Sequence, residues 1–141
     1  MSGFSKDERD AMKQRAEELR ASKGIKGAAK KAKEFEACLE AIDKLSGFDR
    51  TLAERYHVVV TEEAPDLDPK TWYGFPSYAR DGEVVTFVQP ASKFDTRYAT
   101  VGFNESAKLD DGDVWPTVYA VVEWNEDVEK LFRALVTKAV G

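Results

Sequence analysis

The chain has 141 residues, of which 43% are hydrophobic and 11% aromatic, and its formal net charge is −5. This composition indicates one domain with a packed core and excludes a disordered chain. A single Cys and a single His exclude an internal disulfide and a His/Cys zinc site, and because no apolar run is long enough for a membrane span or a signal peptide, we expect a cytoplasmic protein with no membrane partner.

Positive and negative charges are unevenly distributed along the chain. Residues 51–141 carry 9 Lys and Arg residues against 16 Asp and Glu residues. Because nucleic-acid binding needs a dense cationic face, we do not expect nucleic acid as a partner. The exception is a short run with only Gly, Ala and Ile between its lysines: Lys23, Lys26, Lys30, Lys31 and Lys33. The run is typical of a solvated linker, and a basic arm that contacts RNA or another anionic partner is the alternative.

A helix is predicted before this lysine run. Ser5 and Glu8 have the spacing of a capping box, in which each side chain binds the backbone N–H of the other residue. The apolar positions that follow recur at helical spacing: Met12, Ala16 and Leu19. Gly24 is placed to end the helix with a left-handed C-cap. We therefore predict that residues 1–33 form an N-terminal helix followed by a Lys/Gly/Ala-rich linker.

Two more helices are predicted before Pro65. The first covers about residues 34–46 and has one apolar face, made of Phe35, Cys38, Leu39, Ile42 and Leu45. The second begins at Asp49, which can cap it, and ends at about Glu63, because the residue before a proline disfavours helical backbone. Its inner face consists of Leu52, Tyr56, Val59 and Val60.

The pattern changes to strands between about residues 70 and 124, where aromatic and β-branched residues alternate with turn residues. Asp81-Gly82 predicts a type I′ hairpin between strands 75–80 and 83–89. Further strands are predicted at 96–103 and 117–124. Asn125 then caps a C-terminal helix whose buried stripe is Val128, Leu131, Phe132, Leu135 and Ala139. The order predicts an α+β fold, with N-terminal helices, an antiparallel sheet of four to six strands and a C-terminal helix packed on that sheet.

One segment carries a family resemblance. The run Trp72-Tyr73-Gly74-Phe75-Pro76-Ser77-Tyr78 and the hairpin after it resemble the YdhG-like family of bacterial domains of unknown function. Members of that family show a YG-x-P-x-[FY] strand after an Ala-Pro that ends a helix, and Ala64-Pro65 occupies that place here. The resemblance covers about residues 35–140, so we assign 34–141 to a YdhG-like domain. It implies a fold grouped with frataxin-like and YjbR-like proteins, and it suggests iron binding because some members are described as iron chaperones.

Iron binding would need exposed oxygen ligands, because iron accepts carboxylate oxygens. We predict a metal site at the end of the helix that is expected from Asp49 to about Glu63. Its ligands would be Glu62, Glu63, Asp66 and Asp68. A second acidic group lies in a later loop: Asp110, Asp111 and Asp113. A solvated acidic surface is the alternative for both groups.

The aromatic residues of the strand region exceed what one helix-covered face needs. Side chains alternate between the two faces of a strand, so one set belongs to the core and the other can line a binding surface. The predicted binding residues are Trp72, Tyr73, Phe75, Tyr78, Arg97 and Tyr98. Cover by the N-terminal helix or by a second subunit is the alternative.

Binding, rather than catalysis, is the function that these features favour. His57 is expected at the flank of its helix and Cys38 in the core, so no catalytic constellation is recognisable. The resemblance suggests an iron-binding domain or iron chaperone. The alternatives are an interaction module that docks a protein partner or a second copy through its sheet, and a small-ligand binder.

Overall fold

A five-stranded antiparallel sheet forms the centre of the fold, and its strands follow one another in sequence order. The computed structural model describes residues 5–22 and 27–141. The strands are β1 (Asp68–Trp72), β2 (Phe75–Arg80), β3 (Glu83–Gln89), β4 (Ala99–Phe103) and β5 (Val118–Val121). The predicted α+β fold with an antiparallel sheet is therefore confirmed, and β2 and β3 have the predicted bounds.

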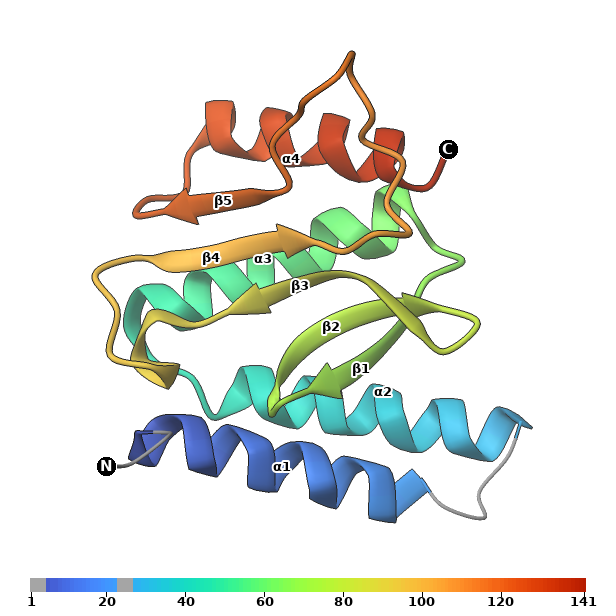
Figure 1. The fold of residues 1–141 in the computed structure, drawn as a ribbon, viewed down its shortest axis with the longest axis vertical. Helices are drawn as coiled ribbons and strands as arrows, with labels where there is room; N and C mark the ends of the chain where they lie inside the picture. Colours follow the sequence, from blue (N-terminus) through green and yellow to red (C-terminus); the bar gives the residue numbers. More distant parts are fainter. Residues whose placement is uncertain (1–4, 23–26) are drawn as a thin grey trace.

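Helices cover one face of this sheet (Figure 1). The helices are α1 (Lys6–Ser22), α2 (Gly27–Asp43), α3 (Gly47–Glu63), the short 3-10 helix η1 (Ala91–Lys93) and α4 (Glu126–Ala139). Residues of α2, α3 and α4 share one hydrophobic core with the inward side chains of the strands. None of the helices in the described part of the chain is both long and apolar enough to cross a membrane.

Three aromatic rings form the centre of this core. Tyr56 of α3 meets Phe132 of α4 edge to face, with ring centroids 5.6 Å apart, and Tyr78 of β2 at 6.2 Å. The Tyr56 hydroxyl lies 2.6 Å from that of Thr86, which donates in turn to the backbone carbonyl of Gly102 at 2.8 Å. Each buried hydroxyl therefore has a partner, which removes the desolvation penalty of burying it.

Several predicted turns and helix ends are confirmed. The backbone N–H of Glu8 donates to the Ser5 hydroxyl, and the N–H of Ser5 donates to the Glu8 carboxylate. Asn125 accepts a hydrogen bond from the N–H of Val128 at 3.0 Å, as an N-cap does. Asp81 and Gly82 both have positive φ, as a type I′ turn requires.

The predicted linker is wrong in its described part. Residues 27–33 belong to α2, which runs unbroken from Gly27 to Asp43, so the predicted boundary between 33 and 34 lies inside a helix. Alanine and lysine are strong helix formers, and they outweigh the glycine at the start of the segment. The predicted cap at Gly24, and Lys23 and Lys26, lie outside the described residues.

Two side-chain predictions on the other helices are also wrong. Asp49 does not cap α3: it lies inside the first turn, and its carboxylate accepts from the N–H groups of Ala91 and Ser92 at the start of η1. Leu131 is 47% exposed, and Val136 takes its place in the buried stripe of α4. In both cases tertiary packing decided between positions that local spacing left equivalent.

Beyond β3, the face of the sheet opposite the core is open. Phe87 lies across Gly102 there, because a Cβ atom on Gly102 would stand 2.3 Å from the Phe87 ring. Towards β5 this side of the molecule exposes two valines, Val118 at 60% and Val122 at 70%. The described part of the chain therefore leaves an apolar strip uncovered at the β5 edge.

Candidate functional site

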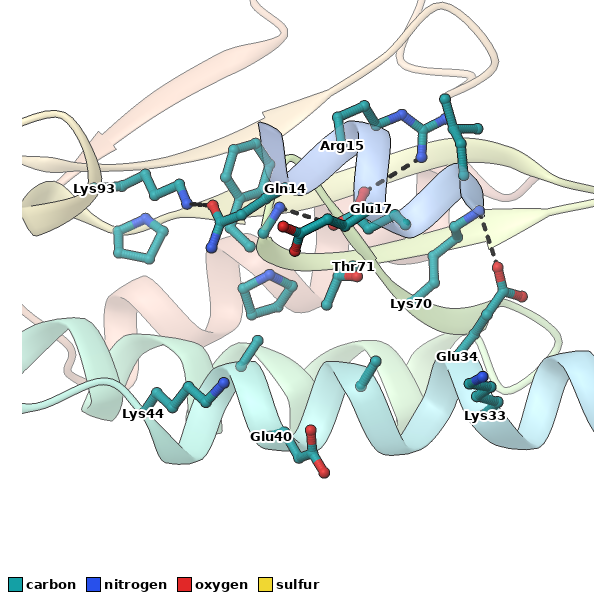
Figure 2. A pocket seen from close by; sticks show the side chains of 18 of the residues that line it. Gln14, Arg15, Glu17, Lys33, Glu34, Glu40, Lys44, Lys70, Thr71 and Lys93 are labelled. Atoms are coloured by element: carbon teal, nitrogen blue, oxygen red, sulfur yellow. Dashed lines mark hydrogen bonds and ion pairs between the residues drawn. The ribbon is translucent and has the colours of Figure 1, made fainter. Parts of the chain in front are cut away.

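A groove of about 650 Å³ lies between α1 and α2. One wall comes from α1 and the other from α2, while the β1–β2 hairpin and η1 complete it (Figure 2). We call it the α1–α2 groove. The residues that line it include Gln14, Arg15, Glu17, Glu18, Lys30, Lys33, Glu34, Ala37, Glu40, Ala41, Lys44, Leu45, Lys70, Phe75, Pro76 and Lys93.

The α1 wall is attached through the tight turn between β1 and β2. Tyr73 and Gly74 have φ values of 54° and 86°, and as the two turn residues they lie outside the strand ladder. Their N–H groups donate to the carboxylate of Glu18, at 3.2 and 2.9 Å. Arg15 pairs with the same carboxylate at 3.3 Å. Glu18 therefore fixes α1 over the turn by satisfying two backbone donors that would otherwise need water.

The α2 wall combines small side chains with lysines. Ala37 and Ala41 lie one helical turn apart and leave space above the helix, whereas Lys33 lies one turn before them and Lys44 directly follows the helix. Glu34, on this wall, forms an ion pair with Lys70 of β1 at 3.2 Å, visible in Figure 2. The floor between helix and hairpin is apolar, and the lysines supply the positive charge.

Lys93 enters the groove from η1. Asp49 holds η1 in place by accepting from Ala91 N–H at 2.8 Å and from Ser92 N–H at 3.1 Å. The Lys93 ammonium donates to the side-chain oxygen of Gln14 on α1. Partial burial lowers the pKa of Lys93, and the nearby carboxylates of α1 oppose that shift. Lys93 is therefore a partly desolvated cation whose hydrogen-bond partner is a neutral amide.

Three of the four carboxylates of the predicted metal site, those of Glu62, Glu63 and Asp68, are held by ion pairs. Arg133 of α4 binds both Glu62, at 2.9 Å, and Glu63, at 2.8 Å. The hydrogen bond from Arg133 lowers the pKa of Glu63. Asp68 pairs with Lys31 of α2 at 3.4 Å. In the ranges that the structure describes, no group of three or more His, Cys, Asp or Glu residues is arranged to hold a metal ion.

The predicted aromatic binding residues are divided among three places. Trp72, Tyr73 and Phe75 form a ring cluster with Phe87, with the Trp72–Phe87 centroids 5.3 Å apart. Tyr78 lies in the core and is fully buried, so it cannot share a binding surface with them.

Arg97 and Tyr98 lie elsewhere, in the segment before β4. The Arg97 guanidinium stands over the Tyr98 ring, 5.3 Å from its centroid. Of the six predicted binding residues, Phe75 alone lines the α1–α2 groove as described.

Cys38 and His57 both contact Tyr78. Tyr78 Oη lies 2.9 Å from His57 Nδ1, and burial lowers the pKa of His57. Cys38 is fully buried, and burial raises the pKa of its thiol to about 11. The expectation that Cys38 lies in the core is confirmed, and a thiol that stays protonated is a weak nucleophile.

Sequence reasoning missed most of the groove. The spacing of Lys30 and Lys33 on one face of α2 would have been a signal, but it was hidden by the prediction of a linker up to residue 33. Gln14 and Glu18 gave no signal, because their roles depend on a turn more than fifty residues away.

Comparison of the chain with family models, with curated proteins and with solved structures gave no match. The resemblance to the YdhG-like family therefore stays a prediction.

Proposed function

We propose that this domain binds a small molecule in the α1–α2 groove. The observation that carries the proposal is the groove itself, whose volume of about 650 Å³ lies within the range of ligand sites in proteins. Ligand sites are mostly apolar, with a few polar groups that fix orientation. This groove combines an apolar part with a larger number of charged side chains around it.

The apolar part of the groove comes from α2, from β2 and from the segment that follows α2. Ala37 and Ala41 of α2 line the groove together with Phe75 and Pro76 of β2, and Leu45, which follows α2, extends this lining. A ligand with a flat or aliphatic body could displace water from Ala37, Ala41 and Leu45, with a gain of about 25 cal/mol for each Å² buried, whereas Phe75 and Pro76 are already buried. The polar groups at the rim would then set its orientation.

Thermal unfolding with a panel of metabolites tests this proposal. A ligand that binds only the folded state raises Tm in proportion to the logarithm of its concentration. The panel should include sugars, nucleosides, nucleotides, sugar phosphates and carboxylic acids. We expect at least one class to raise Tm.

A groove-filling variant locates the site. Ala41→Trp places a large ring in the groove, and we expect it to abolish the rise in Tm. Ala32→Trp is the matched control, because Ala32 is exposed on the same helix and does not line the groove. A ligand whose effect survives Ala41→Trp binds elsewhere and contradicts the proposal.

Docking of a second copy on the open sheet face is a second candidate function. The exposed Val118 and Val122 favour it, since exposed apolar patches mark interfaces. Light scattering over a range of concentrations should then show a dimer that the Val118→Lys variant cannot form. A monomer at every concentration would contradict this candidate.

Iron binding, which the family resemblance suggests, has less support from the geometry. Glu62 and Glu63 already bind Arg133, so a metal ion would have to compete with that cation. Calorimetric titration with ferrous iron under anaerobic conditions tests it. If the heat of binding is lost when Glu62, Glu63, Asp66 and Asp68 are all changed to amides, the predicted iron site is supported. An unchanged isotherm in that variant would contradict it.

A further inference from the structure

The charges around the α1–α2 groove are unbalanced. Six cationic side chains line it, namely Arg15, Lys30, Lys33, Lys44, Lys70 and Lys93. Four carboxylates line it, namely Glu17, Glu18, Glu34 and Glu40. The difference is two positive charges, in a protein whose net charge is −5. The groove is therefore a local positive region on an acidic molecule.

Two of the four carboxylates are already neutralised inside the protein. Glu18 pairs with Arg15 and accepts from two backbone N–H groups, and Glu34 pairs with Lys70. These interactions hold the walls together and leave Arg15 and Lys70 with partners of their own. The excess positive charge therefore lies on the other lysines.

In the described structure none of those lysines forms an ion pair, although the carboxylates of Asp7, Asp10 and Glu18 on α1 lie near enough to Lys93 to act on its charge. Among the residues described, Lys30, Lys33 and Lys44 form no ion pair, and the ammonium of Lys93 binds the neutral Gln14 amide. Figure 2 shows Lys93 of η1 and Lys44, which directly follows α2, at the same end of the groove. The carboxylate of Glu40 points away from the strands in the same view. This end thus presents ammonium groups from two separate segments.

Partial burial makes such a cation a good anchor for an anion. Lys93 has lost part of its hydration, and a charge in a partly desolvated site interacts more strongly with an opposite charge than it does in water. Charge-assisted hydrogen bonds are also about twice as strong as neutral ones. An anionic group would therefore bind Lys93 better than the Gln14 amide does.

We infer that the ligand of the α1–α2 groove is a small organic anion, with its apolar body on Ala37, Ala41 and Phe75 and its anionic group between Lys44 and Lys93. This inference rests on the proposed function and specifies its ligand class. Carboxylate, phosphate and sulfonate groups share the required chemistry.

A matched pair of fluorescent probes tests the inference. 8-Anilinonaphthalene-1-sulfonate and N-phenyl-1-naphthylamine have the same ring system, and only the first carries a sulfonate. We expect the sulfonate probe to bind the wild-type protein with a Kd at least about tenfold lower. Raising the salt concentration from about 0.05 M to about 0.5 M should weaken the binding of the sulfonate probe and leave the binding of the neutral probe unchanged.

Variants then locate the anionic group. The double variant Lys44→Gln/Lys93→Gln should raise the Kd of the sulfonate probe by about tenfold or more. The Kd of the neutral probe should change by less than about twofold. Lys130→Gln/Lys138→Gln on α4 is the control, because it removes the same charge outside the groove. The salt dependence is measured on the wild-type protein, so the test holds even if the first double variant folds poorly.

The outcomes separate this inference from the proposed function. If Ala41→Trp weakens both probes but the sulfonate gives no advantage, the groove binds neutral ligands and the inference alone is overturned. The same follows if the two double variants weaken the sulfonate probe equally. If Ala41→Trp affects neither probe, or if neither probe binds the wild-type protein, both the inference and the proposed function are contradicted.

Discussion

The two terminal helices are attached to the same sheet by different physical means. α4 has 14 residues and buries Phe132, Val136 and Ala139 in the core. α1 is longer, with 17 residues, yet among its side chains described here Ala11 alone is buried. Helix length therefore says little about how firmly a helix is held. The area of apolar surface removed from water decides it.

The apolar residues of α1 show the difference directly. Met12 is 39% exposed and Leu19 is 55% exposed, so the apolar positions that recur at helical spacing in α1 face largely outwards. The helix is instead positioned by the polar contacts of Gln14 and Glu18 with η1 and the β1–β2 turn. Polar contacts to a single turn place a helix accurately but contribute little net free energy.

The largest expected effect tests the α4 side. Phe132→Ala removes a ring that is 1% exposed and contacts Tyr56, so the free energy of unfolding should fall by about 3–5 kcal/mol. Urea denaturation measures it. Leu131→Ala, at the neighbouring exposed position, is the control and should change stability by less than about 1 kcal/mol. Similar losses in both variants would mean that α4 is not held by Phe132.

A smaller loss is expected from the polar contacts of α4. Arg133 binds Glu62, Glu63 and Glu129, and these interactions link α3 to α4. Arg133→Gln leaves three carboxylates close together, so the free energy of unfolding should fall, but by less than in Phe132→Ala. Part of this loss should disappear at high salt, because salt screens the repulsion between the carboxylates. Arg133→Lys keeps the charge, so its stability should lie between that of the wild-type protein and that of Arg133→Gln. A loss independent of salt would show that packing of the arginine, not its charge, is what matters.

Breaking a polar contact of α1 should affect only the turn that this helix contacts. Glu18→Gln replaces a carboxylate that accepts from the N–H groups of Tyr73 and Gly74. We expect hydrogen exchange of those two amides to accelerate by about tenfold, which corresponds to about 1.4 kcal/mol, while global unfolding changes less. Glu17→Gln, on an exposed neighbour, is the control. If Glu18→Gln lowers global stability as much as Phe132→Ala does, the contrast between the two helices is wrong.

The same contrast explains which features the sequence predicts. The stripe of α4, its Asn125 cap and the Asp81-Gly82 turn depend on residues close together in the chain, and spacing alone predicts them apart from the exchange of Leu131 for Val136. The strand order follows because each strand pairs with its neighbour in sequence.

The groove could not be predicted in this way. It depends on where α1 docks, and that is decided by contacts such as Glu18 with the turn at Tyr73 and Gly74. Nothing in the spacing of α1 distinguishes Glu18 from Glu17. Tyr78 shows the same limit from the other side, because period-2 alternation separates two faces of a strand without saying which face is covered.

The smallest expected effect is a dependence of stability on pH on the helix-covered side. Burial lowers the pKa of His57 below its ordinary 6.5, because the charged ring is poorly solvated beside Tyr78 and Phe35. The unfolded chain therefore binds a proton at a higher pH than the folded protein does. Stability should be at its full value above pH 6.5 and should decrease as the pH falls through the interval between the two pKa values.

Urea denaturation at several pH values between about 7.5 and 5.5 measures this decrease. His57→Gln should remove most of it, because glutamine does not titrate. The Arg133 contacts do not interfere, since the lowered pKa of Glu63 and Glu129 places their titration below 4.5. If the wild-type and His57→Gln proteins lose stability in parallel, the dependence arises from other groups. The Tyr78–His57 contact would then tolerate the charged ring as well as the neutral one.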